Sequence, residues 1–167
     1  MRDFATPVGS FWLHTQGHAI TALASAPPGE PADPGLTAQV AQWLQRYFSG
    51  TAPSLEDLPS LQPSGTPFQQ RVWEALRAIP AGQVITYGML AQRIGSAPRA
   101  VGGALAANPI PILLPCHRVV AANGDLRGYS GLGGMKSKQF LLELEGIATI
   151  EKKEGVWGIL PPDPFFQ

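Results

Sequence analysis

The chain has 167 residues, one cysteine, three histidines and a formal net charge of zero. That length can bury a substantial hydrophobic core as one domain or two small ones. A single cysteine excludes an internal disulfide and a thiolate-cluster metal site, and no apolar run approaches the roughly 20 residues that span a bilayer. The N-terminal residues lack the apolar stretch of a signal peptide, so we expect a cytoplasmic protein that binds no metal.

The charged residues are unevenly distributed along the chain. Residues 1–63 and 141–167 each carry a net charge of −3, whereas residues 64–140 carry eight basic and two acidic side chains, for +6. A basic middle between acidic ends is typical of a binding site for a polyanion. A chance fluctuation of composition is the alternative, and charge alone does not decide between them.

The N-terminal third predicts a small sheet and one helix. Residues 8–25 alternate apolar and polar side chains around a break at Gly17, which predicts a pair of strands. Asp33, followed by proline, predicts a helix start, and apolar residues repeat at helical spacing until Gly50. The Pro- and Ser-rich residues 51–65 are typical of a linker. We therefore expect a first domain over residues 1–63, with its linker.

A second domain, residues 64–167, is predicted to be mostly helical. Its first helix begins at Thr66, where a proline and Gln69 complete a capping-box pattern, and ends at Pro80. Two further helices are predicted over 86–94 and 99–107. About three turn residues join them, which indicates a helix-turn-helix. The fold class is therefore α/β, with a small N-terminal sheet-plus-helix domain before a mostly helical domain.

The helix over residues 99–107, "RAVGGALAA", contains almost only small side chains after its arginine. Small residues allow a helix to pack tightly inside a protein. They also allow a helix to enter a narrow cleft, and the minor groove of DNA is only about 6 Å wide. Both interpretations remain open at this point.

The remaining predictions concern the chain around and after the cysteine. Three prolines in residues 108–115 favour an extended segment. Residues 119–129 resemble a strand followed by an Asn-Gly turn, and a last helix is predicted over 135–145. The tail over residues 147–167 has mixed charge and many prolines and yields no prediction.

The only cysteine, Cys116, is followed directly by His117 and Arg118. A thiol becomes a nucleophile as the thiolate, and a neighbouring base or positive charge favours that form. Adjacent residues of a strand point to opposite faces, so His117 can act on Cys116 only where the chain turns or a water bridges them. A buried cysteine beside an incidental histidine is the alternative.

A longer string of residues separates these alternatives. The segment "RAVGGALAANPIPILLPCHRVV" (99–120) closely resembles the signature of the O6-alkylguanine-DNA alkyltransferases. The segments "FQQRVWEALRAIPAGQVITYGMLA" (68–91) and "FLLELEG" (140–146) are similar to those that flank it in that family. The resemblance is specific over about residues 68–146 and general over the N-terminal part.

This resemblance implies direct reversal of DNA damage. A methyl or small alkyl group would move from O6 of guanine in double-stranded DNA to Cys116, after the base flips out of a duplex bound through its minor groove. Each molecule would act once, as a monomer and without a cofactor.

The resemblance also implies roles for residues near the cysteine. Cys116 would accept the alkyl group, His117 would draw its proton through a bridging water, and Glu145 would hold the imidazole. Tyr87 would donate a hydrogen bond or proton to the leaving guanine, and Asn108 would fix the turn before the active-site segment. With this relay we expect the thiol to titrate below its ordinary pKa.

Further residues would contact DNA or the flipped base. Arg99 would enter the duplex in place of the extruded nucleotide, and Gly102 and Gly103 would let the backbone approach DNA closely. The residues expected to line the guanine pocket are Val119, Tyr129 and Ser130.

The sequence departs from the family pattern at two places. The turn before Arg99 is shorter than usual, and the loop after Ser130 is longer.

One rival function is a non-catalytic module that only recognises alkylated bases, although such variants of the family lack the cysteine. The other is a Cys–His hydrolase, for which no oxyanion-hole pattern is visible in the sequence.

Overall fold

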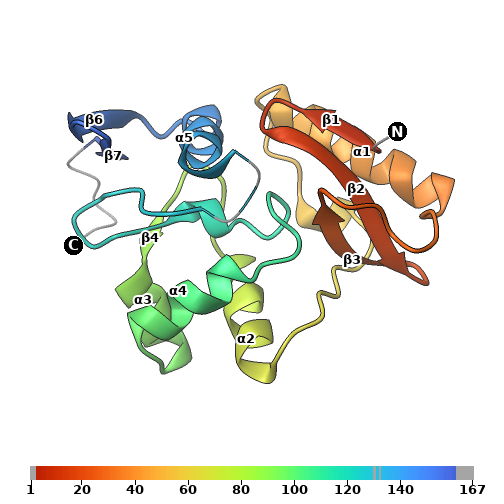
Figure 1. The fold of residues 1–167 in the computed structure, drawn as a ribbon, viewed down its shortest axis with the longest axis horizontal. Coiled ribbons are helices and arrows are strands. Elements are labelled where there is room, and N and C mark those ends of the chain that lie inside the picture. The colour runs from red at the N-terminus through yellow and green to blue at the C-terminus, as the bar shows by residue number, and fades with distance from the viewer. Residues whose placement is uncertain (1–2, 130, 132, 161–167) are drawn as a thin grey trace.

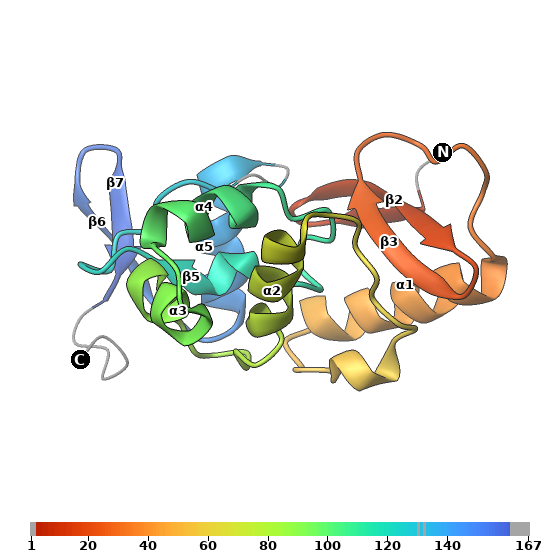
Figure 2. The same ribbon diagram turned by 90° about the horizontal axis from the view of Figure 1, so that it is seen from below.

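The chain forms a mixed α/β fold in a computed structural model that describes residues 3–129, 131 and 133–160 (Figure 1). An antiparallel sheet with one helix forms the N-terminal part (residues 3–63), and the C-terminal part (residues 64–160) is mostly helical (Figure 2). The strands are β1 (Phe4–Thr6), β2 (Gly9–Gln16), β3 (Ala19–Ala24), β4 (Ile85–Thr86), β5 (Val119–Val120), β6 (Thr149–Lys153) and β7 (Val156–Ile159). The α-helices are α1 (Pro34–Phe48), α2 (Pro67–Leu76), α3 (Tyr87–Ile94), α4 (Pro98–Ala106) and α5 (Gly134–Leu144).

The strand pair and helix predicted for the N-terminal part are confirmed as β2, β3 and α1, and β1 adds a third strand that the sequence did not predict. Strands β1, β2 and β3 lie in chain order, and Gly17 adopts a φ of 60° at the turn between β2 and β3. Helix α1 begins where predicted, because the Asp33 side chain accepts hydrogen bonds from the backbone N–H groups of Gly35 and Leu36. Its apolar face is buried, and the residues that form it are Leu36, Val40, Trp43, Leu44 and Tyr47.

The segment predicted as a linker is partly hydrogen-bonded to the sheet. It contains a short 3-10 helix, η1 (Leu55–Asp57), and then runs beside strand β3. The N–H of Ile20 donates to the Ser60 carbonyl at 2.8 Å, and the N–H of Gln62 donates to the Ile20 carbonyl at 2.8 Å. These bonds fix the crossing between the two parts of the chain.

The helix-turn-helix is present with the predicted three-residue turn, between the end of α3 and the start of α4. Gly95 ends α3 in the left-handed conformation, with a φ of 69°, which glycine adopts without steric cost. Helix α2 has the predicted capping box between Thr66 and Gln69. The indole N–H of Trp73 in α2 donates to the carbonyl of Ala104 at 2.8 Å, so α4 is fixed against α2.

The prediction of an extended segment over residues 108–115 is wrong. The segment folds into consecutive tight turns, in which the N–H of Leu114 donates to the Ile110 carbonyl at 2.9 Å and that of Cys116 donates to the Leu114 carbonyl at 2.8 Å. Ile112 has a φ of 74°, a conformation that costs energy for a β-branched residue. Proline excludes a helix but is compatible with turns, and burial of the apolar side chains between them favours the compact path.

After the last helix, the chain forms a β-hairpin that the sequence did not predict. Strands β6 and β7 pair antiparallel, and Ile147 and Ile159 join a small core cluster with Val84, Val120, Leu126 and Leu142. Because Val120 belongs to β5 and Ile159 to β7, the hairpin packs against the segment that follows the cysteine. Among the residues that the structure describes, no helix is long and apolar enough to cross a membrane.

Candidate active site

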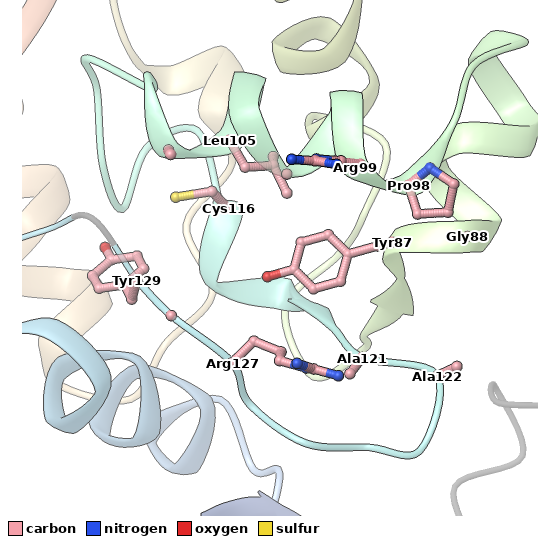
Figure 3. A pocket seen from close by; sticks show the side chains of 13 residues that line it. Tyr87, Gly88, Pro98, Arg99, Leu105, Cys116, Ala121, Ala122, Arg127 and Tyr129 are labelled. Atoms are coloured by element: carbon pink, nitrogen blue, oxygen red, sulfur yellow. The ribbon is translucent and has the colours of Figure 1, made fainter.

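Cys116 begins a single turn of 3-10 helix, η2 (Cys116–Arg118), that leads directly into strand β5. The chain therefore turns at the Cys–His pair, which is the condition under which neighbouring residues can act together. Strand β5 pairs in parallel with β4, with Ile85 opposite Val119. Tyr87 follows β4 immediately, so this short strand pair brings the start of α3 beside the cysteine (Figure 3).

The thiol of Cys116 lies at a cavity of about 650 Å³ between α3, α4 and the segment after β5. That volume lies within the usual range for small-molecule sites. In Figure 3 the phenol groups of Tyr87 and Tyr129 face the cavity together with the sulfur. The lining residues are Tyr87, Gly88, Pro98, Arg99, Gly102, Leu105, Ala106, Cys116, Ala121, Ala122, Arg127, Gly128 and Tyr129.

Of the residues predicted to line the guanine pocket, Tyr129 lines the cavity and Val119 does not. Val119 is fully buried and is not among the cavity-lining residues, and its carbonyl accepts a hydrogen bond from Nζ of Lys138 at 2.7 Å. Gly103, which was predicted to approach DNA rather than to line the pocket, is exposed on α4. Ser130 lies outside the described residues.

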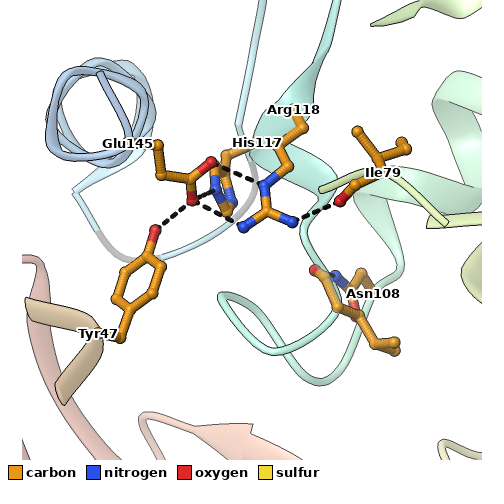
Figure 4. Close-up of polar contacts among 7 residues, drawn as sticks. Tyr47, Ile79, Asn108, His117, Arg118 and Glu145 are labelled. Atoms are coloured by element: carbon orange, nitrogen blue, oxygen red, sulfur yellow. Dashed lines mark hydrogen bonds and ion pairs between the residues drawn. The ribbon is translucent and has the colours of Figure 1, made fainter. Parts of the chain in front are cut away.

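His117 and Glu145 are in direct contact, although 28 positions separate them (Figure 4). Nε2 of the buried imidazole lies 2.7 Å from Oε2 of the carboxylate. Because a carboxylate only accepts hydrogen bonds, Nε2 carries the proton. Nδ1 of His117 is buried and has no hydrogen-bond partner among the described residues. In the neutral imidazole this nitrogen is a base.

The carboxylate of Glu145 is held by two further side chains (Figure 4). Arg118 donates from Nε to Oε1 at 2.7 Å and from Nη2 to Oε2 at 3.0 Å, and the hydroxyl of Tyr47 donates to Oε2 at 2.5 Å. Burial raises the pKa of Glu145, but the hydrogen bonds and charges of His117 and Arg118 outweigh burial and bring it to about 2. The carboxylate is therefore ionised at neutral pH.

The cysteine is neutral in the resting protein. Burial raises the pKa of the Cys116 thiol, although a hydrogen bond from Asn108 and the charge of Lys138 act in the opposite direction. Burial also lowers the pKa of His117 and keeps it neutral. The prediction of a thiol that titrates below its ordinary pKa is therefore wrong for the protein without DNA, because desolvation of the thiolate outweighs its partners.

Asn108 fixes the turn that delivers the cysteine. Its Nδ2 donates to the Leu114 carbonyl at 2.9 Å, and its Oδ1 accepts from the N–H of Ile110 at 2.9 Å. A single amide therefore closes the loop between α4 and η2 from both sides. The N-terminal part also reaches this loop, because the N–H of Leu23 donates to the Pro109 carbonyl at 3.0 Å.

The two tyrosines of the cavity are hydrogen-bond donors at neutral pH. Burial first, and then the negative charge that a Cys116 thiolate would carry, raise the pKa values of Tyr87 and Tyr129, while Arg127 lowers that of Tyr87. Lys138 is almost fully buried, lies 5.9 Å from the centre of the Tyr87 ring, and has its pKa lowered by burial to about 8. Two phenols therefore line the cavity as donors, and a buried cation lies close to the ring of one of them.

Helix α4 divides its small residues between two faces. Val101, Ala104 and Leu105 are buried, which is the packing expected from small side chains. A Cβ atom at Gly102 or Gly103 would meet nothing within 4 Å, so the fold itself does not require glycine there. The packing interpretation is therefore confirmed for the buried face, and entry of the other face into a narrow cleft stays a prediction.

The exposed positive charge is smaller than the sequence suggests. Of the basic residues in 64–140, Arg118 and Lys138 are buried beside the cysteine and its relay. The exposed basic residues of that segment are Arg71, Arg77, Arg93, Arg99, Arg127 and Lys136.

Four residues of this site were not identified from the sequence: Tyr47, Arg118, Arg127 and Lys138. Arg118 directly follows His117, and this adjacency was the only feature of the sequence that could have assigned Arg118 to the site. Tyr47 lies 98 positions from Glu145, and no local pattern relates the two. Lys138 sits on a predicted helix where a solvated lysine is the usual expectation. Arg127 lines the cavity, and in Figure 3 its side chain lies below the Tyr87 ring.

Comparison with known proteins agrees with this geometry. Residues 67–147 match the family model described as "6-O-methylguanine DNA methyltransferase, DNA binding domain". A methylated-DNA–protein-cysteine methyltransferase of Haemophilus influenzae is 40% identical over 159 residues, which cover 89% of this chain and 87% of that protein. A DNA base-flipping protein of Thermus thermophilus is 38% identical over 143 residues, covering 84% of this chain and 96% of that protein.

A solved structure extends the similarity to the fold of both parts. The crystal structure of Mycobacterium tuberculosis OGT in complex with DNA is 40% identical and has a TM-score of 0.75, covering 85% of this chain and 89% of that one. Similarity of this extent, over nearly the whole length of the relatives, establishes the family. The chain belongs to the methylated-DNA–protein-cysteine methyltransferase family.

Proposed function

We propose that this protein repairs DNA by direct reversal, through a single transfer of a methyl or small alkyl group from O6 of guanine to the thiol of Cys116. One observation carries the proposal: the thiol lines a base-sized cavity beside α4, and the next residue, His117, is hydrogen-bonded to Glu145. The partner is double-stranded DNA that contains an alkylated guanine. No cofactor or metal takes part.

The transfer forms one bond and breaks one bond. The sulfur of Cys116 attacks the alkyl carbon, the bond from carbon to O6 breaks, and its electron pair remains on the guanine. Nδ1 of His117 receives the thiol proton through a bridging water, and the ion pair with Glu145 stabilises the imidazolium. Tyr87 donates to the guanine as negative charge develops on it.

The raised pKa of the free thiol supports a late deprotonation. A buried neutral thiol is unreactive toward electrophiles other than the alkylated guanine. It becomes a nucleophile only when that flipped guanine is positioned in the cavity. The thioether that forms has no leaving route, so each molecule acts once. Tyr129, Val119 and Ser130 are proposed to surround the base, with Val119 behind the cavity wall.

We propose that α4 enters the minor groove of the duplex. Its open face with Gly102 and Gly103 supports a close approach to DNA, and Arg99 at its start fills the space left by the flipped nucleotide. Flipping costs a few kcal/mol, and less for a base that pairs badly. Asn108 maintains the turn from this helix to Cys116.

The remaining proposals concern organisation. Residues 1–63 form the N-terminal domain with its linker, and residues 64–167 form the DNA-binding and alkyl-transfer domain with its tail. The protein acts as a monomer in the cytoplasm, associated with the nucleoid when it is bound to DNA.

One experiment separates this function from the two rivals. The protein is incubated with a duplex that carries a labelled methyl group on O6 of one guanine. Transfer of one label per protein supports repair, and its absence from Cys116→Ser identifies the acceptor. Binding without transfer would indicate a module that only recognises the base, and release of label with turnover would indicate a hydrolase.

A further inference from the structure

Tyr47 connects the N-terminal part to the catalytic relay. It lies in α1, and its hydroxyl donates to Oε2 of Glu145 at 2.5 Å, the same oxygen that His117 contacts at 2.7 Å (Figure 4). We propose that Tyr47 is a positioning residue for alkyl transfer, which fixes the Glu145 carboxylate and thereby sets the orientation and basicity of His117. The proposal rests on the proposed function for its effect on rate, but not for its effect on His117.

The phenol of Tyr47 is held rigidly by its neighbours. Its ring stacks on Trp43 with ring centres 5.5 Å apart, and the edge of Phe48 lies against it at 5.1 Å. Tyr47 is only 2% exposed, and the Trp43 indole is itself anchored by a hydrogen bond to the Ser54 carbonyl at 2.9 Å. A donor held in this way restricts the carboxylate to one orientation.

The hydroxyl acts only as a donor to this carboxylate. Burial, followed by the charge and hydrogen bond of Glu145, raises the pKa of Tyr47 far above neutral pH, so the phenol keeps its proton. The groups that face Tyr47 electrostatically are Glu145, Arg118 and Tyr129. Those that face His117 are Glu145, Arg118 and Lys138. Tyr47 therefore influences His117 through Glu145.

The direction of the effect follows from competition for one oxygen. Oε2 accepts from His117, from Arg118 and from Tyr47. A hydrogen bond from Tyr47 disperses the negative charge of that oxygen, so the oxygen stabilises an imidazolium less strongly. Removal of the hydroxyl leaves more charge facing His117 and raises the pKa of the imidazole. It also frees the carboxylate to rotate.

The test uses Tyr47→Phe in the full-length chain. We expect the titration of His117, followed by NMR of the imidazole, to move to higher pH by about 0.5–1 unit. The other two histidines, His14 and His18, are internal references in the same spectra. The single-turnover rate of methyl transfer should fall by about tenfold, with a larger loss at lower pH because His117 acts as a base only when neutral. Affinity for the duplex should be unchanged.

Trp43→Phe is the matched control, because it keeps an aromatic ring against Tyr47 and the Tyr47 hydroxyl on Glu145, and loses only the indole hydrogen bond to the Ser54 carbonyl. It should lower the melting temperature and leave the His117 titration at its original position. An unchanged His117 titration in folded Tyr47→Phe would overturn the proposal, whatever the rate. If wild-type protein transfers no methyl group, the proposed function fails, and the NMR titration still decides the role of Tyr47.

Discussion

Nε2 of His117 lies 2.7 Å from Oε2 of Glu145, and this contact joins the residue after the cysteine to the C-cap of α5. Both side chains are buried: that of His117 is 0% exposed to solvent and that of Glu145 is 2% exposed. The pair is thus isolated from solvent, where a hydrogen bond between an imidazole and a carboxylate is strongest.

Replacing Glu145 by Gln should slow methyl transfer by about 10²–10⁴-fold at neutral pH, the range of acid–base assistance. The amide keeps the shape but not the charge that favours an imidazolium. DNA affinity should change little, because Glu145 is buried away from the cavity. Raising the pH should partly restore the rate, since hydroxide can then remove the thiol proton. Single-turnover assays of methyl transfer, quenched at set times between pH 6 and 10, measure both the loss of rate and its recovery at high pH.

Glu143→Gln is a suitable control for that variant. Glu143 lies on the same helix, is exposed to solvent and contacts only Thr149 and Gln139 among the described residues. Its transfer rate should equal that of the wild type. A Glu145→Gln protein that is folded and transfers methyl at the wild-type rate would exclude the relay.

The same carboxylate should make the protein sensitive to acid. The pKa of Glu145 is about 2 in the folded protein and 4.5 in its ordinary state, so its stabilisation is complete above pH 4.5 and is lost as the pH falls toward 2. The contribution is about 3 kcal/mol at neutral pH. Urea unfolding from pH 6 to pH 2 should show a steeper loss for the wild type than for Glu145→Gln. Parallel curves would mean that another group carries the acid dependence.

Arg99→Ala should weaken repair of a duplex much more than repair of a single strand. Only a stacked duplex has a space that needs filling when a nucleotide is extruded. Arg99 is exposed at the start of α4 and lines the cavity. The comparison requires single-turnover rates on both substrates. Equal losses on the two would indicate that Arg99 only contacts phosphate.

Gly103→Ala should stabilise the protein and weaken its binding to DNA. Alanine in a helix interior is favoured over glycine by about 0.8–1 kcal/mol, and a Cβ at this position meets nothing in the protein. An open position that still carries glycine therefore suggests a partner that approaches closely. Thermal unfolding and duplex affinity are measured together. Ala41→Gly on α1, also an exposed helical site, should have the opposite effect on stability and no effect on affinity.

Local signals predicted most helices of the fold. The capping box of Thr66 with Gln69, the Asp33 cap and the Gly95 stop act within a few residues, so the sequence contains them completely. The path of residues 108–115 was mispredicted because prolines restrict the backbone without selecting between an extended path and turns. Burial against the rest of the core makes that choice, and no short window of sequence contains it.

The site was partly predictable for a similar reason. Cys116 and His117 are adjacent in the sequence, and Glu145 followed from resemblance to a family. The hydroxyl of Tyr47 reaches that carboxylate only because the two parts of the chain pack together, and the sequence carries no signal of it. The direction of the thiol pKa was mispredicted because the depth of burial of Cys116 is a property of the whole fold.

The most direct test of the account is the intact mass of the protein after reaction with a duplex that contains one O6-methylguanine. We predict a gain of about 14 Da, one methyl group, on every active molecule, with peptide mapping that locates it on Cys116. Restored guanine should appear in the duplex in equal amount. An unchanged protein mass with restored guanine, or a methyl group on any residue other than Cys116, would contradict the account.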